Sequence, residues 1–212
     1  MTNLKNVSFS ILFVLISLLS VESHAEPTNF SYTTLGVGIG KETLNTSLCL
    51  AGECYKEFGT GSINGSIQFA DDLLILSFAS SSASNSGPST KWTSSVGSIS
   101  LRLVKNIGSQ LDIHLGVGSL SGRSDFCQGS TCTRYEDNGI AYGAGANIWI
   151  DSNKKFAGKF VVISSKYSKS TKSSTSTAVG LSYYLTQNHE IGLALSNNED
   201  SSSRSIDYNY HF

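Results

Sequence analysis

The chain has 212 residues, 15% of them charged, and its 15 Lys and Arg residues nearly balance 16 Asp and Glu residues. A net charge of −1 offers no basic surface to a nucleic-acid backbone, so no nucleic-acid partner is expected. Low charge, 20 glycines, many serines and a single proline after residue 27, Pro88, favour a sheet protein over packed helices.

The N-terminal segment has the pattern of a secretory signal peptide. Lys5 precedes an uncharged run at residues 7–21, and small residues at Ser23 and Ala25 form the motif that signal peptidase recognises. The run is shorter than the roughly 17–25 residues of a membrane-spanning helix, which argues against a membrane anchor. We therefore expect residues 1–25 to be removed during export through the general secretory pathway, leaving residues 26–212 as the mature domain.

From residue 30 onwards, apolar and polar residues alternate with the two-residue period of β-strands. The last segment shows this most clearly, because Ile206, Tyr208, Tyr210 and Phe212 alternate with polar residues. After residue 21 no apolar run approaches the ~17 residues of a transmembrane helix. Strands are expected at residues 30–40, 58–70, 73–84, 91–105, 109–122, 139–150, 156–168, 173–185, 189–198 and 203–212.

Two properties of these segments favour a membrane barrel over a soluble sandwich. Many segments run for about ten residues, which lets a tilted strand cross the hydrocarbon layer, whereas soluble strands usually have about five or six residues. The connections also alternate in length, as in barrels with short periplasmic turns and longer outer loops. The tight connections are residues 71–72, 106–108, 151–155 and 186–188, and the main outer loops are expected at residues 41–57 and 123–138.

Aromatic residues at Tyr208, Tyr210 and Phe212 lie on one face of the last strand, and Phe212 ends the chain. Here the sequence resembles the small porin-like outer-membrane β-barrel family, the OmpA-type and OmpX-type barrels. The resemblance implies an all-β, transmembrane, antiparallel up-and-down barrel in the cell outer membrane. It also implies that these three residues form the signal read by the barrel-assembly machinery, after delivery by periplasmic chaperones. Members commonly have eight strands, so eight is the alternative to the ten counted above.

The positions of charged residues indicate which strand faces point into the lumen. With Ile99, Leu101 and Leu103 toward lipid, Arg102 lies in the lumen, whereas an outward arginine near the midplane would cost about 2–4 kcal/mol. The same alternation predicts a polar lumen network, with glycines making room for large side chains; its members are Arg102, Asp112, His114, Asn147 and Asp207. In the seventh strand the alternation sends Val161 and Ile163 inward, which suggests a β-bulge there.

The four cysteines form two C-x4-C pairs, Cys49 with Cys54 and Cys127 with Cys132. Both pairs fall in the expected outer loops. An exported chain favours disulfides, and the close spacing favours local bridges over the other two connectivities. A metal site would need further ligands, and no histidine is near either pair in the sequence. Two structural disulfides are therefore expected, with no metal and no cofactor.

The sequence does not favour a catalytic role. Asp112 and His114 are two residues apart on one strand face, about 6.6 Å by strand rise, and no G-x-S-x-G motif is present. The aromatic residues Trp92 and Tyr183, with those of the last strand, are expected in the interfacial girdle. We therefore expect no enzyme activity.

The leading hypothesis is a structural or surface-interaction barrel, adhesin-like, that contacts outer-membrane lipid and binds an extracellular ligand through residues 41–57 and 123–138. The alternatives are a narrow porin-like channel for small solutes and, third, a barrel enzyme. Barrels of about eight strands fill their interior with side chains, and open channels appear at about 16 strands, so ten strands favour the first hypothesis.

Overall fold

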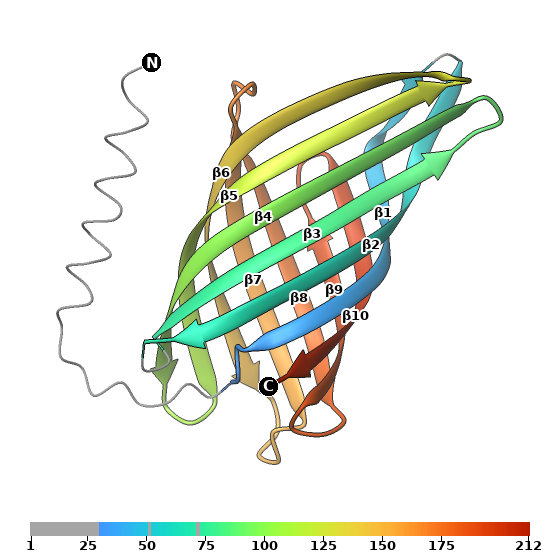
Figure 1. Ribbon diagram of the computed structural model, residues 1–212. Helices are drawn as coiled ribbons and strands as arrows, with labels where there is room; N and C mark the ends of the chain where they lie inside the picture. Colours follow the sequence, from blue (N-terminus) through green and yellow to red (C-terminus); the bar gives the residue numbers. More distant parts are fainter. Residues whose placement is uncertain (1–29, 51, 71–72) are drawn as a thin grey trace, which may run out of the picture.

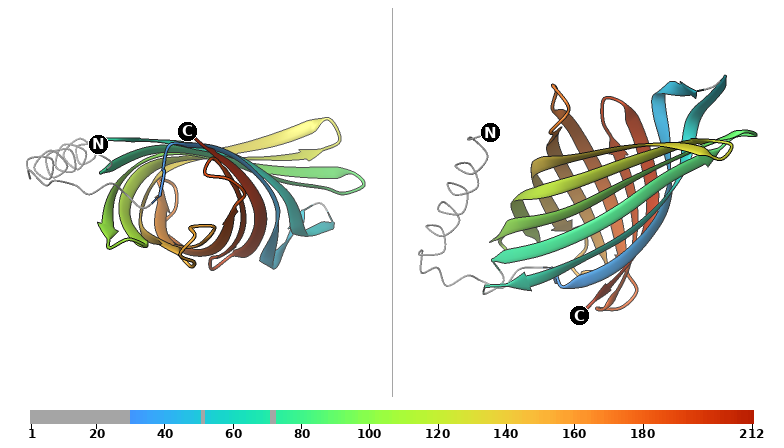
Figure 2. Two further views of the ribbon diagram at one scale, coloured as in Figure 1. Left: turned by 90° about the horizontal axis from the view of Figure 1, so that it is seen from below. Right: turned by 45° about the horizontal axis from the view of Figure 1, so that its top comes forward.

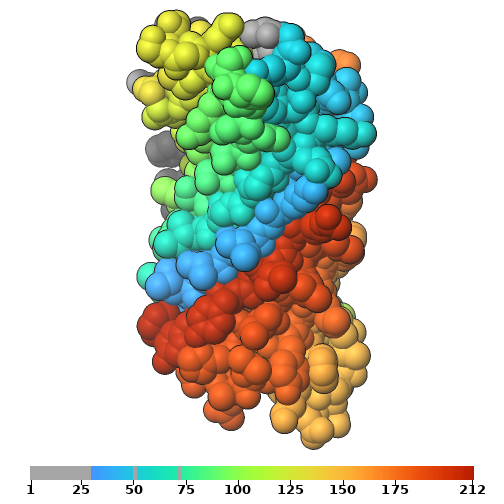
Figure 3. All heavy atoms as spheres, turned by 90° about the vertical axis from the view of Figure 1, so that its right-hand side faces the viewer, coloured from blue at the N-terminus to red at the C-terminus, as the bar shows by residue number. Residues whose placement is uncertain are grey.

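The computed structural model describes residues 30–50, 52–70 and 73–212, which form one closed antiparallel barrel of ten strands (Figure 1). The strands are β1 (Thr34–Leu50), β2 (Glu53–Phe69), β3 (Leu74–Ser86), β4 (Thr90–Ile107), β5 (Leu111–Gln128), β6 (Thr131–Trp149), β7 (Phe156–Tyr167), β8 (Ser174–Tyr184), β9 (His189–Asn197) and β10 (Ser201–His211). Consecutive strands pair with each other, and β1 closes the barrel against β10, where Figure 3 shows the blue and red strands side by side. The all-β barrel and its ten strands are confirmed, and the alternative of eight is wrong. The predicted signal peptide, residues 1–25, lies outside the described residues.

The two-residue alternation of apolar and polar side chains gives the barrel an apolar outer face and a polar lumen. In β1, Leu35, Val37 and Ile39 are exposed on the outer surface, whereas Gly38 faces Asp207 inside the barrel. The other strands repeat this alternation, so large apolar side chains cover the outside and polar side chains line the interior. Transmembrane barrels have this arrangement, because lipid rather than water solvates the outer band.

The barrel wall is much taller on one side than on the other. Strands β1, β2 and β4–β6 have 17 to 19 residues, whereas β7–β10 have 9 to 12. The start of β1 and the C-terminus lie at one end, called the base, and the opposite end is the far rim (Figure 1). Beyond the far rim the long strands continue as hairpins that extend to one side of the ring (Figure 2). This projecting sheet comprises residues 43–50, 52–59, 84–96 and 122–138.

The expectation of long outer loops is wrong. Most of residues 41–57 and 123–138 belong to strands: β1 continues to Leu50 and β2 begins at Glu53, while a short turn at residues 129–130 joins β5 to β6. Water reaches the sheet beyond the membrane band, so its outer residues need not be apolar and the alternation that marks a membrane strand fades. Extra length at the far rim is therefore carried by paired strands rather than by irregular loops.

The β-bulge suggested for the seventh strand is also absent. The register of β7 is continuous against both β6 and β8, and Val161 lies in the lumen opposite Gly145 and Ala178. These small neighbours leave room for an inward valine without a shift in register. Among the described strand pairs, the register shifts in β1 against β2, between Thr43 and Leu48.

Candidate functional site: a plugged lumen and a projecting sheet

An aromatic layer crosses the lumen just inside the base. The Phe30 ring stacks on the Trp149 indole with centroids 4.4 Å apart, and the Trp149 and Tyr184 centroids are 4.8 Å apart. These side chains are buried together with Ile75 and Val104. Trp149 and Tyr184 point inward from β6 and β8, whereas Phe30 enters the barrel from the segment that precedes β1. Two rings of the layer thus come from the barrel wall, and the third comes from the segment that precedes β1.

The aromatic layer separates two cavities. The upper cavity, about 480 Å³, lies in the lumen and is lined mainly by polar residues, with Phe30 and Tyr184 among them. The lower cavity, about 550 Å³, lies at the base beside residues 152–155 and 185–187. Tyr184 and His211 line both cavities, which places the layer between them. The lumen is therefore closed near the base by side chains.

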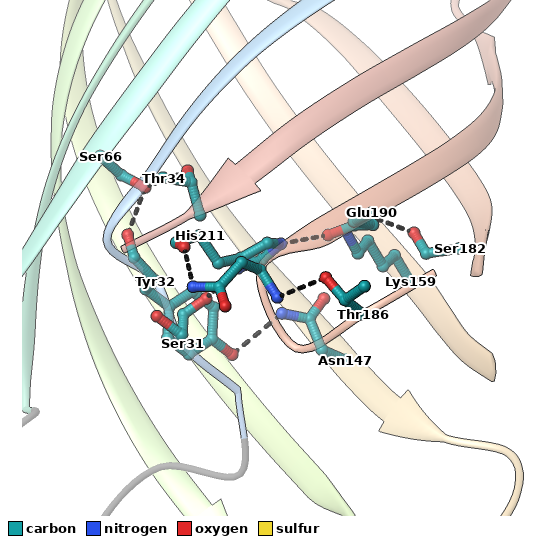
Figure 4. A network of polar contacts seen from close by, with 11 residues as sticks. Ser31, Tyr32, Thr34, Ser66, Asn147, Lys159, Ser182, Thr186, Glu190 and His211 are labelled. Atoms are coloured by element: carbon teal, nitrogen blue, oxygen red, sulfur yellow. Dashed lines mark hydrogen bonds and ion pairs between the residues drawn. The ribbon is translucent and has the colours of Figure 1, made fainter. Parts of the chain in front are cut away.

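Polar contacts fix the N-terminal segment, residues 30–33, inside the barrel (Figure 4). The Tyr32 hydroxyl donates to Asp112 Oδ2 at 3.2 Å and accepts from Asn147 Nδ2 at 2.9 Å. Asp112 Oδ2 also accepts from the Phe30 backbone amide at 3.3 Å. Three further lumen side chains bond this segment: Ser66, Gln68 and His211. These bonds come from several strands, so the segment is held as part of the barrel interior.

Glu190 lines the upper cavity and is the centre of a buried cluster of charged side chains (Figure 4). Its carboxylate, only 1% exposed, accepts from Ser182 Oγ at 2.6 Å, from His211 Nε2 at 2.8 Å and from the Lys159 ammonium. His211 Nδ1 lies 3.1 Å from the Ser31 carbonyl oxygen, so the imidazole ring contacts Glu190 on one side and residue 31 on the other. The cluster therefore links β7, β8, β9 and β10 to the N-terminal segment.

The structure divides the predicted lumen network. Asp112 and Asn147 are joined through the Tyr32 hydroxyl. Asp207 accepts from Ser205 Oγ at 2.9 Å, and none of the ion pairs found in the described part of the chain joins it to Arg102. Glu190, which is absent from the predicted network, forms the ion pairs found in the described part of the lumen, with Lys159 and His211.

Arg102 and His114 lie in the lumen where glycines leave space for them. A Cβ at Gly116 would lie 2.6 Å from Arg102 Cγ, and one at Gly145 would overlap the His114 ring. Arg102 Nη2 donates to Ser77 Oγ at 2.7 Å, while its buried Nε has no acceptor among the described residues. The glycines on neighbouring strands are therefore needed for the size of these side chains.

The two-residue alternation of inward and outward side chains, here called strand parity, could have predicted the Glu190 cluster. Ile191, Leu193 and Leu195 face outward, which sends Glu190 inward, and the same parity sends Lys159 inward. Opposite charges on the inward faces of nearby strands were thus the sequence signal from which an ion pair in the lumen could have been predicted. Phe30 and Tyr32 lie within the predicted first strand, residues 30–40, and alternate inward like Gly38. In the structure β1 begins only at Thr34, so both residues enter the lumen from the segment before the strand.

The inner face of the projecting sheet carries a second apolar cluster. Phe58 and Tyr55 are buried there with Ala83, and Leu44 and Trp92 pack against them. The Phe58 and Trp92 ring centroids are 4.7 Å apart. The expectation that Trp92 belongs to the interfacial girdle is therefore wrong, because its ring packs within the projecting sheet. This packing supports the sheet beyond the barrel ring.

Hydrogen bonds tie the tip of the β1–β2 hairpin to the β3–β4 turn. The Glu53 carboxylate accepts from the Tyr55 hydroxyl at 2.7 Å, from Ser89 Oγ at 2.8 Å and from the Thr90 hydroxyl. The Thr90, Tyr55 and Ser89 side chains stabilise the carboxylate and lower the pKa of Glu53 to about 2. Glu53 therefore stays ionised through the neutral range and can hold the two hairpins together.

Charged and aromatic side chains line the exposed β5–β6 hairpin. Asp125 accepts from Arg123 Nε and from Arg134 Nε, each at 2.8 Å. The hydrogen bond from Arg134 has the largest effect in lowering the pKa of Asp125, and that from Arg123 follows. The Lys169 ammonium lies 4.9 Å from the centre of the Tyr135 ring, which is more than half exposed. The hairpin thus presents arginines and a tyrosine, side chains that are common in binding surfaces.

Each disulfide closes the tip of one hairpin in the projecting sheet. Cys49 bonds Cys54 and Cys127 bonds Cys132, and each pair occupies directly opposite positions of two paired strands. The local pairing thus follows from strand register. Neither disulfide joins one hairpin to another.

Replacing Cys127 and Cys132 together by serine should leave the barrel folded. A bridge over so short a loop removes little chain entropy, less than the ~3 kcal/mol estimated for a 15-residue loop. We expect unchanged heat-modifiability on gels and faster amide exchange confined to residues 123–136. Loss of the folded form in this double variant would show that the bridge supports the barrel itself. Replacing one cysteine alone should instead produce mixed disulfides through an exposed thiol.

The aromatic residues of the last strand lie together on the outer face at the base. The Tyr210 and Phe212 ring centroids are 4.9 Å apart, and the Tyr208 hydroxyl is 2.6 Å from His189 Nδ1. Phe212 is 69% exposed. This position suits an interfacial girdle, and it leaves the predicted assembly signal accessible on the barrel surface.

No arrangement typical of catalysis or metal binding is found in the described part of the chain. Ser182 donates to Glu190 rather than to His211, so these residues do not form a nucleophile with its base. Across residues 30–50, 52–70 and 73–212 no group of three or more His, Cys, Asp or Glu could hold a metal ion. In the same ranges no helix is long and apolar enough to span a bilayer.

No protein-family model and no curated protein matches the sequence. Several solved structures share its barrel architecture. Neisserial surface protein A is 12% identical over 86% of this chain and 98% of its own, with a TM-score of 0.48. The N-terminal β-barrel domain of Pseudomonas aeruginosa OprF is 10% identical over 86% of this chain and 99% of its own, with a TM-score of 0.42. Ail of Yersinia pestis is 11% identical over 85% of this chain and 99% of its own, with a TM-score of 0.39. The likeness concerns the fold of the barrel.

Proposed function

We propose that this chain is an outer-membrane protein that holds the projecting sheet outside the cell on a barrel with a closed lumen. The carrying observation is the unbroken pairing of β5 with β6, from Leu111 opposite Ile148 near the base to Gln128 opposite Thr131 at the tip. A continuous ladder of this kind supports the hairpin as a rigid extension of the wall. Rigid presentation lowers the ordering cost of binding, which suits an adhesin-like surface.

The proposal places the base in the periplasm and the far rim outside. Export through the general secretory pathway, transfer by periplasmic chaperones and recognition of Tyr208, Tyr210 and Phe212 by the barrel-assembly machinery belong to the same proposal. Epitopes inserted at Asn153 and Gly129 test the orientation. On intact cells the Gly129 epitope should be labelled and the Asn153 epitope should not, and the reverse pattern would contradict the placement.

A narrow channel is the competing function. The polar upper cavity favours it, and the aromatic layer of Phe30, Trp149 and Tyr184 opposes it. In planar bilayers the purified chain should give no stepwise conductance. Stepwise currents from the unmodified protein would favour the channel.

A shortened hairpin tests the binding role. Deleting residues 125–134 leaves Ser124 and Tyr135 as a turn between Arg123 and Glu136, which are opposite each other in β5 and β6. Cells with the full chain should adhere to at least one surface in a panel of immobilised polysaccharides, proteins and whole cells. The deletion should lower adhesion at least tenfold with unchanged barrel levels.

The matched control removes residues 170–172, a turn at the same rim but outside the projecting sheet. This control should leave adhesion unchanged. Equal losses from both deletions would mean that the projecting sheet is not the binding surface.

A further inference from the structure

Two cations lie directly opposite each other on the outer surface where β1 meets β10. Lys41 is the register partner of Arg204, and both lie on the same face as Ile39 and Ile206 one step nearer the base. Like charges directly opposite each other on paired strands are destabilising unless an anion lies between or beside them. A negatively charged neighbour would therefore stabilise this pair, which lies where β1 closes the barrel against β10.

Glu57 supplies part of that negative charge. Its carboxylate bonds the Lys41 ammonium at 2.7 Å, and this hydrogen bond lowers the pKa of Glu57, with smaller contributions from Arg204 and Lys56. One carboxylate thus neutralises one of the three nearby cations. A second anion would balance the site more closely.

The height of the pair on the barrel matches the head-group region of a membrane. On β1 the outward residues nearer the base are Leu35, Val37 and Ile39, all exposed apolar side chains. Lys41 is the next outward residue and the first charged one on that strand. On β10 the change from Ile206 to Arg204 occurs at the same level. The cations therefore mark the upper edge of the apolar band.

A surface cavity of about 460 Å³ lies beside the two cations. Lys41 and Arg204 line it together with the apolar side chains of Val179 and Leu195. Val179 is opposite Leu195 in register, and both lie on the outer face of the barrel. Two residues with hydrogen-bonding side chains, Ser202 and Asn197, also line this cavity. One pocket thus combines cationic, hydrogen-bonding and apolar surface at the membrane boundary.

We propose that this pocket binds a phosphate-bearing lipid of the outer leaflet, with its phosphate at Lys41 and Arg204 and an acyl chain along Val179 and Leu195. The site rests on the outward placement of the far rim given under the proposed function. Phosphate suits the pair because Arg donates in a fork and Lys adds a point charge. The apolar part of the pocket favours an amphiphile over a free anion.

Binding to the purified full barrel in phosphatidylcholine nanodiscs tests the site. The probes are lipopolysaccharide, the same lipopolysaccharide after enzymatic removal of its phosphates, and inorganic phosphate. We expect Arg204→Gln to weaken lipopolysaccharide binding about fivefold, and the Lys41→Gln/Arg204→Gln double variant about 25-fold, from typical contributions of a basic residue near an anionic surface. Glu57→Gln should tighten binding, because it removes the competing carboxylate.

Lys91→Gln is the matched control, since Lys91 is an exposed cation on β4 that does not line the pocket. Its affinity should equal that of the unmodified chain. Equal weakening by Lys91→Gln and Arg204→Gln would reduce the effect to general surface charge and overturn the site. Equal affinity for dephosphorylated lipid, or competition by inorganic phosphate at the same concentration as the lipid, would also overturn it. The adhesion result for the shortened hairpin does not affect this measurement, so the two proposals can fail separately.

Discussion

Replacing Phe30 and Trp149 together by alanine should convert a silent barrel into a conducting one. The two stacked rings form the part of the aromatic layer that separates the upper cavity from the lower one. Their removal leaves Tyr184 as the remaining large ring of that stack and opens a continuous polar path. We expect stepwise currents in planar bilayers from the double variant under conditions where the unmodified chain gives none.

The same variant should lose stability, because large-to-small changes at buried aromatic positions typically cost about 3–5 kcal/mol each. Heat-modifiability on gels must therefore show that the conducting protein is folded. Phe156→Ala is the matched control, since this aromatic residue lies at the base but packs against Tyr183 on the outer surface. A folded double variant that stays silent would mean that other groups close the lumen.

The barrel itself was predictable because each membrane strand must satisfy lipid on one face. The alternation in residues 205–212 and the charge of Arg102 between Leu101 and Leu103 carry that constraint in the sequence. The structure adds the closure of β1 on β10 and confirms the ten predicted strands over the alternative of eight. Lipid contact leaves a periodic signal, so the wall of the barrel could be predicted.

The projecting sheet left no such signal. The outward residues of its β5–β6 hairpin include Arg123, Asp125 and Arg134, which suit water on a strand as well as on a loop. Cross-strand pairing of Cys127 with Cys132 was compatible with either structure. The paired hairpins therefore required the three-dimensional register.

The sequence predicted which polar residues face the lumen, but it did not predict which of them contact each other. The two-residue alternation placed Asp112, Asn147 and Asp207 inside, yet the first two are joined by Tyr32, which lies before the observed start of β1. Arg102 bonds Ser77 rather than one of the predicted carboxylates. Which inward side chains meet depends on strand tilt and on the entry of the N-terminal segment, and neither is encoded in a two-residue period.

Glu190→Ala should be the most destabilising single charge change in the lumen. Removing one partner of a buried ion pair typically costs about 3–5 kcal/mol, because the remaining charge loses its compensation. We expect about 3 kcal/mol, near the lower end, since the Lys159 side chain is 33% exposed and can turn toward lumen water. Urea unfolding in lipid vesicles, followed by the fluorescence of Trp92 and Trp149, measures the loss.

A double variant separates the charge effect from lost packing. Glu190→Gln with Lys159→Met keeps an acceptor for Ser182 and removes both charges of the pair, so it should recover most of the stability lost in Glu190→Ala. Lys159→Met alone should cost less than Glu190→Ala, because Glu190 keeps the bond from His211 Nε2 at 2.8 Å. Since His211 also contacts the Ser31 carbonyl, loss of Glu190 should loosen the N-terminal segment and speed amide exchange at residues 30–33. Unchanged exchange there, in a variant that is destabilised, would mean that the cluster supports the wall without holding the plug.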